Sequence, residues 1–153
     1  MDTRPDIEVY SPDHRLQLVV EVKSTPGASP QWAARFRRNL LSHGAVPNAP
    51  YFLIALPDCL FLWSRSSGMN VPPDYEAATA DVVREYLGSW AAGSGDLGEG
   101  SLQIAVGSWL RDLAQTFRRP RRDSEADRML LDSGAYQAIR NGSVAFEPNG
   151  IGR

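Results

Sequence analysis

The fold of this chain is decided near its N-terminus by PDIEVY at residues 5–10 and LQLVVEVKS at residues 16–24. Apolar and polar residues alternate in both runs, and the turn-forming residues SPDHR at 11–15 separate them. This pattern predicts a two-stranded β-hairpin. Because the apolar residues of the two strands must share a face, the numbers of paired residues add up to an odd value.

The register of the hairpin follows from the length of its turn. A four-residue turn at 12–15 places Ile7 opposite Val20 and Asp6 opposite Glu21. The other four-residue turn, at 11–14, moves the pairing by two residues and leaves the faces unchanged. Asp6, Glu8, Glu21 and Lys23 are expected on one side of the hairpin in either case.

The paired carboxylates of Asp6 and Glu21, with the ammonium group of Lys23, are not favoured on a largely apolar hairpin by stability alone, since like charges repel and burial of a charge is costly. A divalent cation such as Mg²⁺ or Mn²⁺ resolves the conflict, because these ions take oxygen ligands and are held by one or two carboxylates. The other interpretation is that Glu21 and Lys23 form a weak ion pair at an exposed strand end.

The sequence Pro5-Asp6, a spacer, and an apolar strand ending in Glu21-Val22-Lys23 resembles the PD-(D/E)xK nuclease superfamily, which has the restriction-endonuclease-like fold. The resemblance implies that Asp6 and Glu21 are ligands of Mg²⁺ or Mn²⁺. It implies that Lys23 positions the attacking water and that Gln31, on the following helix, joins the catalytic site. It also implies hydrolysis of phosphodiester bonds in nucleic acid, with DNA as the expected substrate.

A crossover helix and a second hairpin are expected after Lys23. Ser29 is a typical N-cap, Pro30 suits the first helical position, and Gly44 follows the expected end. The apolar run 51–56 predicts a buried strand parallel to the Glu21 strand, and residues 59–64 predict an antiparallel return. The fold class expected is therefore α/β, a restriction-endonuclease-like mixed sheet with a mainly helical C-terminal half.

We expect one domain over residues 1–153, with residues 1–64 as the sheet core and residues 74–147 as a helical extension. Helices are predicted from Asp74 to about Trp90, at 102–117 and at 125–139, followed by a short strand at 144–146. The Gly-rich stretch at 91–100 is predicted to be a flexible connector. It lacks the Gly-Lys-Ser/Thr ending of a phosphate-binding loop.

The helix and strand that precede the Pro-Asp strand in the superfamily have no counterpart before Pro5. Their absence predicts an open sheet edge, and a second copy of the chain or a partner chain is expected as one way to complete the sheet. A non-catalytic or incomplete nuclease-fold module, acting in protein or DNA binding and assembly, is therefore the alternative to the enzyme.

Two groups of arginines are candidates for contact with nucleic acid. Arg35 and Arg38 lie on the crossover helix, and four more lie in the run Arg118, Arg119, Arg121 and Arg122. Two structural roles stay open: a solvated helix surface for the first group and a helix C-terminal cap for the second.

The composition and the net charge exclude several classes of protein. A net charge of −2 argues against a protein that coats nucleic acid indiscriminately, and 42% hydrophobic residues is ordinary for a globular domain. The single cysteine, Cys59, excludes an internal disulfide. The sequence has no apolar run of membrane-spanning length, so no membrane partner and a cytoplasmic location are expected.

Overall fold

The computed structural model describes residues 5–64, 68–88 and 97–146. It is a mixed α/β structure whose central six-stranded sheet has the strand order β5-β4-β3-β2-β1-β6. Among the strands of the described residues, β2 and β3 are parallel and the other neighbouring pairs are antiparallel. The strands are β1 (Ile7–Tyr10), β2 (Leu16–Val22), β3 (Tyr51–Ala55), β4 (Cys59–Trp63), β5 (Tyr75–Ala78) and β6 (Ser143–Phe146).

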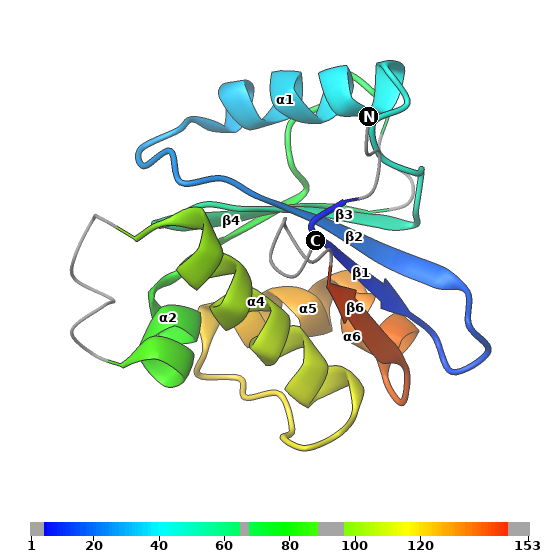
Figure 1. The fold of residues 1–153 in the computed structure, drawn as a ribbon, viewed down its shortest axis with the longest axis vertical. Coiled ribbons are helices and arrows are strands. Elements are labelled where there is room, and N and C mark those ends of the chain that lie inside the picture. The colour runs from blue at the N-terminus through cyan, green and yellow to red at the C-terminus, as the bar shows by residue number, and fades with distance from the viewer. Residues whose placement is uncertain (1–4, 65–67, 89–96, 147–153) are drawn as a thin grey trace.

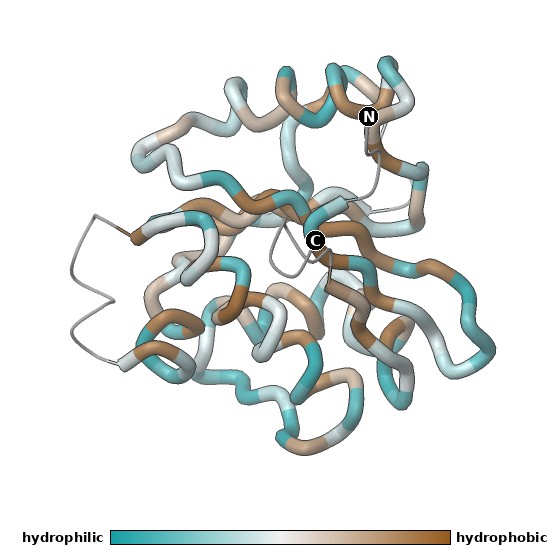
Figure 2. The backbone as a smooth tube through the Cα atoms, viewed as in Figure 1, coloured by the Kyte–Doolittle hydropathy of each residue, from teal (hydrophilic) through white to brown (hydrophobic). Residues whose placement is uncertain are grey.

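Helices cover both faces of the sheet (Figure 1). One face carries α1 (Pro30–Ser42), and the other carries α2 (Ala80–Leu87), α4 (Glu99–Ala114), α5 (Glu125–Ser133) and α6 (Ala135–Ile139). Alternate residues of each central strand face opposite layers, so that Val19 packs toward α1 and Val20 toward the other helices. Figure 2 shows the hydrophobic residues concentrated along these central strands.

The predicted register of the N-terminal hairpin is confirmed. Ile7 pairs with Val20 and Val9 with Leu18 in an antiparallel ladder. A bulge between Val9 and Tyr10 then shifts the pairing of Tyr10 to Leu16. Such a bulge increases local twist and leaves the residues before it in register, so the carboxylate end of the hairpin keeps the predicted pairing.

The crossover from β2 to β3 also has the predicted form. The Ser29 hydroxyl accepts a hydrogen bond from the Trp32 backbone N–H at 3.1 Å, and Pro30 occupies the first turn. Gly44, with φ of +67°, follows the helix in a left-handed conformation that favours glycine. Strands β3 and β4 form the expected second hairpin.

The prediction of a helix beginning at Asp74 is wrong. Residues Tyr75–Ala78 form β5, which pairs with β4 at the edge of the sheet, and the helix begins only at Ala80. The buried Thr79 marks the change, since its hydroxyl donates to the Leu56 carbonyl at 2.8 Å. The helix-favouring composition of this segment is overridden by pairing with a buried neighbouring strand. Trp90, the predicted helix end, lies outside the described residues.

Two further helix boundaries differ from the prediction. The predicted helix at 125–139 is divided into α5 and α6 by Gly134, whose φ of +88° interrupts the helical backbone. The predicted helix at 102–117 runs instead from Glu99 to Ala114, so its first turn lies within the Gly-rich stretch at 91–100. Residues 89–96 of that stretch and its approach lie outside the described residues.

Strand β6 covers the free edge of β1. Ile7 pairs with Phe146 and Tyr10 with Ser143 in an antiparallel ladder. Gly142 precedes this strand so closely against the Tyr10 carbonyl that a Cβ atom at this position would overlap it. The edge of β1 is therefore completed within the chain, and the prediction of an open edge beside this strand is wrong.

In the described parts of the chain, no helix combines the length and the apolar character needed to cross a lipid bilayer.

Candidate metal and catalytic site

The two predicted metal ligands meet where β1 begins and β2 ends. The Asp6 backbone N–H donates to Glu21 Oε2 at 3.3 Å, and the Val22 backbone N–H donates to Asp6 Oδ2 at 2.8 Å. These bonds continue the hairpin beyond the Ile7–Val20 pair, with side-chain oxygens as acceptors in place of backbone carbonyls. The structure thus brings Asp6 and Glu21 together as the predicted register requires.

Burial makes the charge of this pair costly. Glu21 is only 9% exposed, and burial, followed by the nearby Asp6 charge, raises the pKa of its carboxyl group to about 7. Burial also raises the pKa of Asp6, against the opposing effect of the hydrogen bond from Val22. Lys23 lowers both pKa values through its positive charge. The site therefore lacks positive charge relative to its two carboxyl groups.

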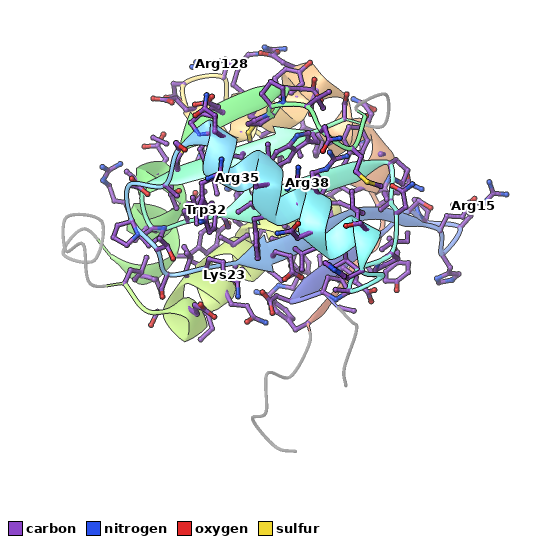
Figure 3. All side chains as sticks on the ribbon, turned by 90° about the horizontal axis from the view of Figure 1, so that it is seen from above. Arg15, Lys23, Trp32, Arg35, Arg38 and Arg128 are labelled. Atoms are coloured by element: carbon purple, nitrogen blue, oxygen red, sulfur yellow. The ribbon has the colours of Figure 1, made fainter. Side chains whose placement is uncertain are left out.

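Lys23 lies on the same face of β2 as Glu21, toward α1. Its Nζ is 5.4 Å from the centroid of the Phe36 ring, which stacks on Trp32 at a centroid distance of 5.2 Å. Figure 3 shows Lys23 and Trp32 beside α1. The aromatic pair provides a cation-attracting surface along the Lys23 side chain, so α1 restricts the positions that this ammonium group can take.

Helix α4 contributes two residues that the sequence analysis missed. The buried Gln103 donates from Nε2 to the Asp6 backbone carbonyl at 3.2 Å. Glu99, one turn earlier, is exposed, and its charge raises the pKa of both Asp6 and Glu21. Their spacing of four residues was the available signal, because residues i and i+4 share a helix face. The sequence analysis did not use this spacing because Glu99 lies at the end of the Gly-rich stretch, which was predicted to be a connector and not part of a helix.

Gln31 is not brought into contact with this site. It is exposed in the first turn of α1, and within the described parts of the chain no hydrogen bond links it to Asp6, Glu21 or Lys23. The role that the resemblance implies for Gln31 stays a prediction.

The two candidate arginines of α1 lie on its outer surface, over the face of the sheet that also carries Lys23 (Figure 3). Arg38 Nη1 lies 3.5 Å from Asn70 Oδ1, and both line a small pocket of about 130 Å³ together with Arg35. Between them in sequence, Arg37 is buried against the rings of Phe52 and Trp63. Arg35 and Arg38 are therefore the α1 arginines available to a phosphate.

The second arginine cluster is largely engaged in ion pairs. Arg118 bonds Asp127 at 2.7 Å and Glu85 at 2.8 Å, and its side chain is only 12% exposed. Arg121 also reaches Glu85, at 3.4 Å, and Arg122 lies 2.9 Å from an Asp132 oxygen.

Distance further separates this cluster from the carboxylates. The arginines follow the C-terminus of α4, whereas Glu99 and Gln103 lie in its first two turns. A helix of 16 residues is about 24 Å long. The structure therefore does not bring Arg118, Arg119, Arg121 and Arg122 to the predicted site.

The donor set fits a hard divalent cation. Asp6 Oδ1 and Glu21 Oε1 accept no hydrogen bond from any described residue, because the bonds to these carboxylates use Oδ2 and Oε2. Residues 5–64, 68–88 and 97–146 contain no group of three or more His, Cys, Asp or Glu side chains placed to hold a metal. Mg²⁺ is commonly held by one or two carboxylates and keeps several waters, so a two-carboxylate site is sufficient for it.

Comparisons of this chain with protein-family models, with curated proteins and with solved structures give no match.

Proposed function

We propose that this chain is a metal-dependent nuclease of the restriction-endonuclease-like type that hydrolyses phosphodiester bonds in DNA. The observation that carries the proposal is the contact between Asp6 and Glu21 across the end of the hairpin, with one oxygen of each carboxylate fixed by a backbone N–H. The parallel β2 and β3 joined by α1, flanked by antiparallel neighbours, support the assignment of the fold type.

Asp6 and Glu21 would hold Mg²⁺ or Mn²⁺ through their remaining oxygens. When bound, such an ion stabilises negative charge on a phosphate and lowers the pKa of a coordinated water. The backbone N–H groups of Asp6 and Val22 orient the two carboxylates before any cation arrives. This preorganisation reduces the entropic cost of assembling the site.

Lys23 supplies positive charge to the site in addition to that of the metal ion. Its ammonium group has three donors, which suit the oxygens of a phosphate or an attacking water. The Trp32–Phe36 stack limits the excursion of the side chain and keeps the ammonium on the face where Glu21 lies. The exposed Arg35 and the half-buried Arg38 on α1 offer contacts for phosphates farther along the nucleic-acid backbone.

The test combines Mg²⁺ and Mn²⁺ binding by calorimetry with nicking of a supercoiled plasmid. The variants are Glu21→Gln and Asp6→Asn, and Glu76→Gln is the matched control because Glu76 is exposed on β5, three strands from β2. We expect wild type and the control to bind the ion and nick DNA, and the two site variants to lose both. Ion binding without nicking would favour the non-catalytic module, and no ion binding by wild type would overturn the metal site.

A further inference from the structure

A second polar cavity lies at the far end of α4, between the loop that follows this helix and the turn that precedes β6. Its volume is about 600 Å³, within the range of small-molecule sites. It is lined by Thr116, Arg119, Pro120, Tyr136, Arg140 and Asn141. None of these residues belongs to the Asp6–Glu21 site.

Two arginines line the cavity without an ion pair to any described carboxylate. Among residues 5–64, 68–88 and 97–146, no carboxylate lies within ion-pair distance of Arg119 or Arg140, and the residues that line the cavity include no acidic one. The neighbouring Arg118, Arg121 and Arg122 are all paired with carboxylates. In a chain with a net charge of −2, two arginines that line one cavity and have no described ion-pair partner favour an anionic ligand.

A nearly buried tyrosine adds a neutral hydrogen-bonding group to the same wall. Tyr136 is 8% exposed, packs in the core with its ring and lines the cavity. A tyrosine hydroxyl can donate to or accept from a ligand oxygen.

The backbone around the cavity is held in an uncommon conformation. Thr116 and Asn141 line it from opposite segments, and both have left-handed φ values, +60° and +65°. A β-branched residue rarely adopts this conformation, and such strain is concentrated at functional sites. The Asn141 N–H donates to the Ala114 carbonyl at 2.7 Å, which ties the second segment to the end of α4.

We propose that this cavity binds a phosphate monoester. The two guanidinium groups match its charge of about −1.5 to −2 at neutral pH, and their planar donors suit phosphate oxygens. The monoester belongs either to a small molecule such as a mononucleotide or to the phosphorylated end of a nucleic acid. The site lies at the opposite end of α4 from the carboxylates, so this proposal does not depend on the proposed nuclease activity.

The test is calorimetry in EDTA with inorganic phosphate and a 5′-mononucleotide. Arg119→Gln and Arg140→Gln should each weaken binding by about tenfold or more, since each removes charge-assisted hydrogen bonds. Tyr136→Phe should weaken it by a smaller factor. Arg122→Gln is the matched control, an exposed arginine of the same loop that is paired with Asp132, and it should bind as wild type does.

A pair of single-stranded DNA oligonucleotides, identical except for a 5′-phosphate, distinguishes the two sources. If the mononucleotide binds more tightly than the phosphorylated oligonucleotide, the site is one for a small molecule. If the phosphorylated oligonucleotide binds more tightly than both the unphosphorylated one and the mononucleotide, the site is one for a nucleic-acid end. The proposal is overturned if wild type binds neither inorganic phosphate nor the mononucleotide nor the phosphorylated oligonucleotide, or if Arg122→Gln weakens binding as much as Arg119→Gln. All these affinities are measured in EDTA, without a divalent cation and without cleavage, which separates this result from the test of the metal site.

Discussion

Glu21 is the residue at which the stability of the fold and the proposed chemistry oppose each other. Its carboxyl group is 9% exposed beside Asp6, and its pKa is raised from 4.5 to about 7. A raised carboxyl pKa means that the folded state holds the proton more tightly than the unfolded state. Ionisation of Glu21 therefore destabilises the metal-free fold, and a bound cation would offset that cost.

In EDTA, we expect the free energy of unfolding to fall as the pH rises from 4.5 to about 7 and to level off above that value. The contribution of Glu21 is up to about 3 kcal/mol, from 1.36 kcal/mol for each pH unit between the two pKa values. Urea unfolding across this range is the measurement. Glu21→Gln should lose most of the dependence of the free energy of unfolding on pH, whereas Glu76→Gln should retain it.

Saturating Mg²⁺ should reduce the pH dependence of the free energy of unfolding in wild type, since the ion stabilises the ionised form of Glu21. Parallel profiles for wild type and Glu21→Gln would show that Glu21 does not titrate as the structure indicates.

Neighbouring arginines illustrate what the sequence can and cannot predict for single residues. Asp6 and Glu21 were predicted as a pair because strand alternation determines which residues face one another. The different environments of Arg118 and Arg119 were not predictable from their adjacent positions. Arg118 meets Glu85 and Asp127 on other elements, and those contacts depend on how α2 and α5 pack.

At the scale of elements, α4 links the two candidate sites. Its first turns contact the hairpin through Gln103, and its end borders the arginine-lined cavity through Thr116. The sequence predicted a helix here from its apolar periodicity but placed its start three residues late. Gly98 and Gly100 have low helix propensity, and burial of Leu102 against the sheet outweighs it.

Gln103→Met should weaken Mg²⁺ binding by about 10- to 100-fold, as is typical when an outer hydrogen bond that orients a metal ligand is lost. Methionine keeps the length of the side chain and removes the donor to the Asp6 carbonyl. Calorimetry measures the affinity, and the pKa of Glu21 by NMR gives a second readout. Leu113→Ala, a destabilising change near the other end of α4, should leave the affinity unchanged. Equal losses in both variants would indicate a general effect of stability.

At the scale of the whole molecule, the sheet takes its edges from the later part of the chain. Strands β5 and β6 lie at the two ends of the strand order, and β6 pairs with β1. The sequence predicted the short strand near 144–146 but not its partner. The pairing of β6 with β1 and the packing of α4 bring these two later elements against the N-terminal hairpin.

Gly142→Ala should lower the free energy of unfolding by about 1–3 kcal/mol, because the new Cβ would overlap the Tyr10 carbonyl and displace β6. Gly100→Ala is the control, since nothing lies within 4 Å of its Cβ position in the first turn of α4. That change should raise stability by up to about 1 kcal/mol. Urea unfolding measures both, and hydrogen exchange should show faster exchange in β1 for Gly142→Ala alone. A neutral effect of Gly142→Ala would contradict the close packing of this turn.

The sequence by itself determined the hairpin, its register and the β2–α1–β3 crossover, and through them the Asp6–Glu21 pair. These features depend on side-chain alternation, a short turn and helix-capping residues, which act over a few positions along the chain. Only the tertiary structure decided that Gln103 holds Asp6, which arginines are neutralised, and that β6 covers β1. Such contacts join residues as far apart as 97 positions, and packing of the complete core selects them.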